Sequence, residues 1–198
     1  MPDQDIRSQP EIIPELDGIR ARIIASMDAA RTVAEGLSDA QFNRRAGADE
    51  WSVCECLGHL VLVGEKLCVA FDTAIEKAHR DGKLGRGPFR YGPLESWFAR
   101  AASQTQPSAR KRFRTFKLYE PRHEQSAVNV LSAYNTLQRN LVERVEAASG
   151  LDLARIKITS PATRWVRLSL GQWLVMVAGH QERHLAQATR ARARIQAG

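Results

Sequence analysis

Four long stretches of the sequence repeat apolar residues at intervals of three or four, which is the period of an amphipathic α-helix. These stretches cover residues 14–35, 52–81, 126–149, and 169 almost to the C-terminus. Little of the chain shows the strict alternation that indicates a half-buried strand. Because each apolar stripe must be buried against another element, we predict an all-α protein with a four-helix bundle fold.

Local signals at the starts of helices agree with these boundaries. In a capping box, a Ser or Thr at the N-cap is followed three residues later by Glu or Gln, and the two side chains bond each other's backbone N–H groups. The spacing occurs three times, at Ser38 with Gln41, Ser52 with Glu55, and Ser169 with Gln172. The first predicts a short helical turn, and the other two predict the starts of the second and fourth long helices.

Between the second and third predicted helices, residues 80–122 lose the helical period. The segment is rich in Gly and Pro, and within it only LESWFARA is compatible with a short helix. It holds eleven Lys or Arg and three Asp or Glu, so it accounts for the whole net charge of +7. A connection of about 40 residues is too long for a plain loop in a compact domain. We therefore predict one domain, residues 1–198, with a basic insertion that is either functional or mobile.

Composition and length exclude several classes of protein. The 198 residues suffice for one domain with its own core. No apolar run approaches the ~20 residues needed to span a bilayer, and the polar N-terminus lacks the pattern of a signal peptide. The three cysteines, Cys54, Cys56 and Cys68, have neither disulfide nor zinc-site spacing. We expect a cytoplasmic protein that does not enter a membrane.

Two histidines in the fourth predicted helix suggest a chemical role. His180 and His184 are four residues apart, and both face the apolar stripe that runs through Leu170, Trp173 and Val177. Side chains at this spacing have Cβ atoms ~5–6 Å apart, close enough for two imidazoles to chelate one ion. The alternative is that both are hydrogen-bonded packing residues. Two imidazoles in contact in a core each need a partner, and one metal ion would serve both.

A third ligand can be sought among the remaining histidines. His79 lies at the end of the second predicted helix and His123 lies in a loop, so we expect both to be solvated. His59 lies at the edge of the second helix's stripe and can reach the bundle interior. Three imidazoles from two helices, with an open fourth position, are typical of a catalytic metal site. Glu55 lies four residues before His59. It is either the capping partner of Ser52, which we favour, or a catalytic group beside the metal.

The sequence excludes two other metal motifs. HQERH has Gln181 where the metalloprotease motif HExxH requires glutamate. No pair of helices carries the Glu-x-x-His motifs of a ferritin-like di-iron centre.

Two segments carry a family resemblance. ADEWSVCECLGHL in the second predicted helix and SLGQWLVMVAGHQERHLAQ in the fourth resemble the DinB-like superfamily. The resemblance implies a four-helix bundle that binds one divalent ion, zinc or nickel among others, through His59, His180 and His184. Some relatives are thiol S-transferases, which join a small thiol to an electrophile, and others are described as metal-dependent hydrolases.

We therefore expect a metal-dependent enzyme of thiol S-transferase or hydrolase type, acting on a small-molecule substrate. In S-transfer the open metal position would take the sulfur of a low-molecular-weight thiol, and in hydrolysis it would take water. The basic insertion could cover the site and contact anionic groups through Arg112, Arg114 and Lys117. The alternative for these three residues is a solvated run of charge.

Two other functions remain open. The bundle could be a non-catalytic interaction protein with a structural or vestigial metal site. We expect a homodimer, and Trp97 and Phe98 could pack against a partner. The segment RKRFRTFK combines positive charge with aromatic residues, as single-strand nucleic-acid binding requires. It lacks a recognised nucleic-acid module, so we favour this function least.

Overall fold

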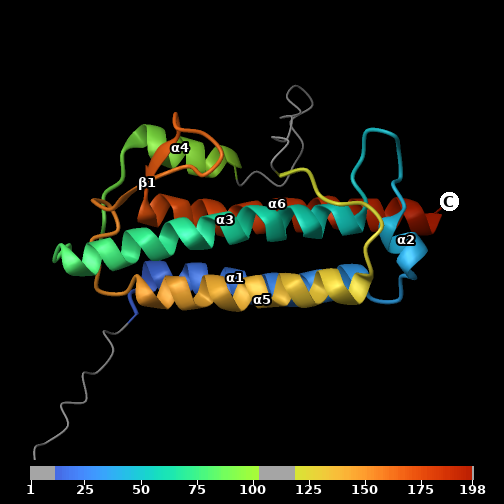
Figure 1. The fold of residues 1–198 in the computed structure, drawn as a ribbon, viewed down its shortest axis with the longest axis horizontal. Coiled ribbons are helices and arrows are strands. Elements are labelled where there is room, and N and C mark those ends of the chain that lie inside the picture. Colours follow the sequence, from blue (N-terminus) through green and yellow to red (C-terminus); the bar gives the residue numbers. More distant parts are fainter. Residues whose placement is uncertain (1–11, 103–118, 198) are drawn as a thin grey trace, which may run out of the picture.

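A computed structural model describes residues 12–102 and 119–197, and it confirms the all-α fold (Figure 1). The four long helices are α1 (Pro14–Ala34), α3 (Val53–Arg80), α5 (Ala127–Ala147) and α6 (Leu170–Ala197). Two short helices, α2 (Asp39–Asn43) and α4 (Pro93–Ala102), and a hairpin of β1 (Lys157–Thr159) and β2 (Arg167–Ser169) complete the described elements. The long helices begin and end within two residues of the predicted positions.

Two of the three predicted capping boxes are present. Ser38 and Gln41 cap α2, and Ser52 and Glu55 cap α3, each through a reciprocal pair of hydrogen bonds. Ser169 instead ends β2, and its hydroxyl donates to Glu95 Oε2 at 2.8 Å. That contact comes from α4, which lies 74 residues earlier in the chain, so local spacing could not reveal it.

The helices form a bundle whose connections are not simply up and down. Helix α5 packs against α1 and α3, and α6 packs against the same two helices. Figure 1 shows that α3 and α5 run in the same direction, so the chain between them returns along the length of the bundle. Two parallel neighbours need such a crossover, which explains why the second-to-third connection is long.

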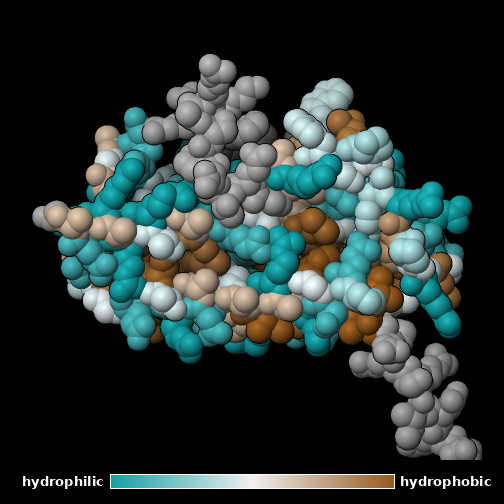
Figure 2. All heavy atoms as spheres, turned by 180° about the vertical axis from the view of Figure 1, so that it is seen from behind, coloured by the Kyte–Doolittle hydropathy of each residue, from teal (hydrophilic) through white to brown (hydrophobic). Residues whose placement is uncertain are grey.

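The core contains two clusters of buried apolar residues. One surrounds Phe71, Leu141 and Trp173 near the hairpin, and the other surrounds Phe42, Leu57 and Tyr134 near α2. Each draws on several of the long helices, whose apolar stripes therefore meet in the interior. On the face shown in Figure 2, apolar side chains form interrupted patches among hydrophilic ones. Among residues 12–102 and 119–197, no helix combines the length and apolarity that crossing a membrane requires.

The first part of the insertion is docked on the bundle. Leu84 forms an isolated bridge with Leu151, and the Tyr91 hydroxyl donates to Glu15 of α1 at 2.5 Å. Glu95 of α4 pairs with Lys157 of β1 at 2.6 Å. The segment LESWFARA is therefore a helix held against the hairpin and α6, and it is not a free loop.

Close packing between α3 and α5 depends on the absence of a side chain at Gly64. A Cβ there would lie 2.7 Å from Leu137 Cδ1, and Leu137 is itself buried. We expect Gly64→Ala to lower the free energy of unfolding by about 1–2 kcal/mol, because overpacking outweighs the gain in helix propensity. Gly18 in α1 is exposed with nothing near its Cβ position, so Gly18→Ala should raise stability by up to ~1 kcal/mol. Urea denaturation of both variants tests whether the two changes in the free energy of unfolding have opposite signs. A stabilising effect of Gly64→Ala would contradict the packing argument.

Candidate metal centre

Three histidines converge between α3 and α6. The ring centroid of His59 lies 4.7 Å from that of His184 and 5.3 Å from that of His180, and the last two are 4.6 Å apart. One nitrogen of each ring lies within 4.8 Å of the corresponding nitrogens of the other two. Among the described residues these three form a cluster that could hold a metal ion.

The helices bring these side chains together for simple geometric reasons. His180 and His184 are one turn apart on α6, so they share a face. His59 reaches the same space from α3, which packs directly against α6. His59 and His184 are each 5% exposed, and His180 is partly exposed. The three imidazoles are thus presented by two rigid elements and not by loops.

The orientation of His59 is fixed from outside the bundle. Its Nδ1 lies 2.9 Å from the carbonyl oxygen of Tyr119. A carbonyl can only accept, so Nδ1 carries the hydrogen and Nε2 keeps its lone pair. A backbone carbonyl on one nitrogen is the usual device for orienting a metal-binding histidine.

All three histidines are held neutral by their surroundings. Burial lowers the pKa of His59 below its ordinary value, and the nearby Arg183 guanidinium acts in the same direction. Burial lowers the pKa of His180 and of His184 much further, and the proximity of the other imidazoles adds to the effect. Neutral imidazole is the form that binds metals, so the cluster is in its ligand form at neutral pH.

Two residues that contact the cluster were not identified as site residues from the sequence. The Trp51 ring stacks on His184 at a centroid distance of 5.6 Å and contacts His59 at 4.9 Å. Arg183 Nη2 lies 3.0 Å from His184 Nε2. The Trp-Ser pair before α3 was part of the family resemblance, which is the one signal for Trp51. Nothing in the apolar periodicity indicated Arg183.

The donor set fits a divalent metal ion. Three neutral nitrogen ligands from two helices leave at least one coordination position open, as in catalytic zinc sites. In addition, His184 Nδ1 is buried and has no hydrogen-bond partner among the described residues. Native interiors seldom leave such an atom unpaired, and an absent ion is one explanation for it.

Comparison with known proteins agrees with this arrangement. The family model described as the DinB superfamily matches residues 22–188, which include all three histidines. The chain belongs to the DinB superfamily. The resemblance found in the sequence is thereby confirmed.

A curated relative of this DinB-superfamily chain is the uncharacterized protein YuaE of Bacillus subtilis (strain 168). The two are 23% identical over 163 residues, covering 82% of this chain and 90% of the relative. No solved structure is significantly similar to the chain.

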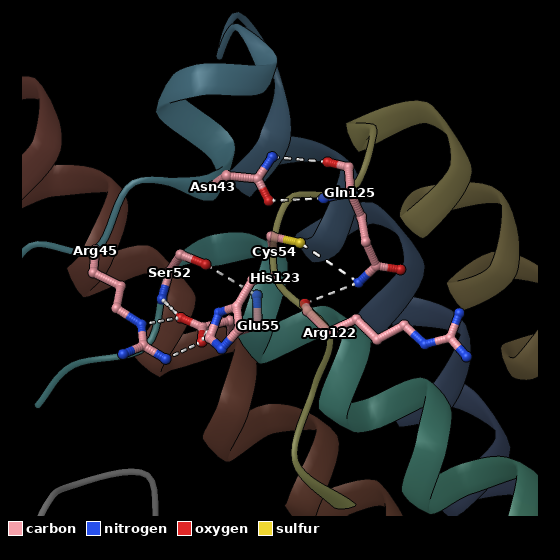
Figure 3. A network of polar contacts seen from close by, with 8 residues as sticks. All are labelled: Asn43, Arg45, Ser52, Cys54, Glu55, Arg122, His123 and Gln125. Carbon is pink, nitrogen blue, oxygen red and sulfur yellow. Dashed lines mark hydrogen bonds and ion pairs between the residues drawn. The ribbon is translucent and has the colours of Figure 1, made fainter.

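Glu55 lies at the centre of a polar network at the start of α3 (Figure 3). Its carboxylate accepts from Arg45 Nε at 2.8 Å and from the Ser52 backbone N–H at 2.9 Å, and it pairs with His123 Nδ1 at 2.9 Å. Burial alone would raise the Glu55 pKa, but the hydrogen bonds from Arg45 and Ser52 lower it below its ordinary value. These contacts support the capping role that we favoured over a catalytic one.

We expect Glu55→Ala to lower the free energy of unfolding by about 2 kcal/mol, because it removes a helix cap and leaves the backbone N–H of the buried Ser52 and the Arg45 guanidinium without this acceptor. The metal content should not change. Thermal melts with elemental analysis check both points. Glu76→Ala, at an exposed position of the same helix, is the matched control. Loss of metal in Glu55→Ala with unaltered stability would instead indicate a role at the metal centre.

The same network anchors residues 119–126, which we call the strap. Asn43 Nδ2 donates to the Gln125 carbonyl at 2.8 Å, and Gln125 Nε2 lies 3.7 Å from Cys54 Sγ. With the His123–Glu55 pair, these contacts hold one end of the strap on α2 and α3. At its other end the strap supplies the Tyr119 carbonyl to His59.

Of the other residues singled out from the sequence, some lie where we expected and others do not. His79 and His123 are exposed as expected, although His123 also pairs with Glu55. Trp97 is 62% exposed, whereas Phe98 packs partly against the core and offers little to a partner. The proposed anion contacts, at positions 112, 114 and 117, lie outside the described residues.

None of the three cysteines has the character of a nucleophile. All are free thiols and all are buried. Burial raises the pKa of Cys54 and of Cys56, and it raises the pKa of Cys68 to about 11. A buried thiol with a raised pKa is inert at neutral pH. The three cysteines are therefore poor candidates for a nucleophile at the histidine cluster.

Proposed function

We propose that the protein is a divalent-metal-dependent enzyme, using zinc or nickel, that promotes attack of a small external nucleophile on an electrophilic small molecule. One observation carries the proposal: three neutral imidazoles from two helices converge and leave a coordination position open. A cation held there would lower the pKa of a bound thiol or water and so supply a nucleophile at neutral pH.

The chain's own residues would hold and orient this site. His59, His180 and His184 would be the ligands, and the Tyr119 carbonyl would keep Nδ1 of His59 protonated. Trp51 stacks on His184 and contacts His59, so it would restrict the movement of both rings. We favour a low-molecular-weight thiol as the nucleophile because the buried cysteines offer no thiol of the protein's own. The thiol would lose its proton to solvent, its sulfur would form a bond to the electrophilic carbon, and the leaving group on that carbon would depart with the electron pair of the broken bond.

The test is a turnover assay on protein stripped of metal and reloaded with zinc or nickel. Wild type should convert a panel of electrophiles only when a small thiol is present, and His184→Ala should fall to the background rate. His79→Ala changes an exposed histidine at the end of α3 and is the control. Ester or amide cleavage without thiol would assign hydrolysis instead. Absence of both activities from fully loaded protein would contradict the enzyme proposal.

A further inference from the structure

Among the residues that the structure describes, Arg183 has no counter-ion at its place beside the histidine cluster. Its guanidinium is partly buried, and within the described part of the chain no carboxylate pairs with it. Carboxylates on nearby segments are engaged elsewhere, as Glu182 is with Arg22 at 2.7 Å and Glu55 is with Arg45. Keeping a partly buried charge unpaired is costly, so a bound anion at this position would be stabilising.

The contact that Arg183 does make depends on the state of His184. A guanidinium has only donors, so Nη2 donates to His184 Nε2, which must carry the lone pair of the neutral ring. The hydrogen is then on Nδ1, the buried atom that has no partner among the described residues.

A metal ion is incompatible with this arrangement whichever nitrogen it binds. Binding at Nε2 uses the lone pair that accepts from Arg183. Binding at Nδ1 moves the hydrogen to Nε2, which can then no longer accept. In both cases Arg183 loses its acceptor, and its guanidinium is left free beside the metal.

We propose that metal binding releases Arg183 from His184 and that the freed guanidinium binds a carboxylate group of the ligand at the three-histidine site. This inference rests on the metal centre of the proposed function and adds a substrate class to it, since one reactant must be an anion. The placement is suitable, because Arg183 lies three residues after His180 and therefore on the same side of α6. The planar fork of arginine matches a carboxylate through two parallel hydrogen bonds.

Acetate is the simplest probe of this site. Protein loaded with cobalt(II) is titrated with acetate, and binding is followed by the visible spectrum of the metal. Arg183→Gln should weaken acetate binding by roughly 10- to 100-fold, the size expected for a lost charged hydrogen bond. Arg183→Lys keeps the charge without the fork and should retain part of the affinity. Arg192→Gln is the control, because Arg192 is a partly buried arginine of the same helix whose guanidinium bonds the Thr32 carbonyl.

Metal affinity gives a second, independent readout by calorimetry. Arg183→Gln should bind zinc as tightly as wild type or up to ~10-fold more tightly, since the metal no longer displaces a charged donor. Weaker zinc binding in this variant would overturn the release argument.

If wild type and Arg183→Gln both hold stoichiometric metal and bind acetate equally well, the anion site is overturned and the metal centre is not. A wild type that takes up no metal would overturn the proposed function as well.

Discussion

Wild-type protein should contain about one divalent ion per chain, and both His59→Ala and His184→Ala should contain almost none. Each variant removes one of three nitrogen ligands from a small cluster, and two imidazoles hold a cation far less firmly than three. Elemental analysis of tag-free protein measures the content directly. His79→Ala should keep its metal, because that side chain is exposed at the far end of α3.

The same variants should lose the stabilisation that metal gives. A ligand present at 100 times its dissociation constant stabilises the folded state by about 2.7 kcal/mol. Added zinc should therefore raise the melting temperature of stripped wild type and leave His59→Ala and His184→Ala unmoved. Variants that keep stoichiometric metal, or a wild type that binds no added zinc, nickel or manganese, would mean that the three histidines are packing residues.

Metal-free protein should become less stable as the pH falls below about 6.5, the ordinary pKa of histidine. Burial lowers the pKa of His180 and His184 well below that value in the folded state. In this window the unfolded chain binds protons that the folded chain does not, so acid favours unfolding. Each histidine contributes about 1.4 kcal/mol per pH unit, or about 2.7 kcal/mol for the pair. His59, whose pKa is also lowered, acts in the same direction.

Urea denaturation in chelator at several pH values between 5 and 7.5 measures this slope. The double variant His180→Gln/His184→Gln should lose most of it, since the titrating groups are gone. An equal slope in the double variant would show that other groups control acid sensitivity and that the two imidazoles are not held neutral.

Much of the fold followed from local pattern. The stripes of the four long helices give their ends within two residues, because helix period and capping depend on neighbours in sequence. The histidine pair of the cluster could also be predicted from the sequence, because helical geometry puts His180 and His184 on one face of α6. His59 needed the further assumption that its helix packs against α6, which the structure shows.

The groups around the cluster could not be found in this way. The partner of His59 is a backbone carbonyl 60 residues away, and its position depends on the path of the strap. Arg183 lies beside His184 in sequence, but apolar periodicity does not reveal whether a charged side chain turns toward solvent or toward a site. The Ser169 hydroxyl contacts Glu95 for a similar reason, because the placement of α4 is a tertiary effect.

The parallel direction of α3 and α5 has a consequence for how this protein can diversify. The return of the chain along the bundle ends in the strap, whose Tyr119 carbonyl contacts His59. Helix packing constrains such a return far less than it constrains the helices, and lengthening a loop costs little stability. Evolution can therefore vary the chain beside the cluster with less effect on helix packing than a change in the helices that present the imidazoles, as long as the Tyr119 carbonyl keeps its place on His59.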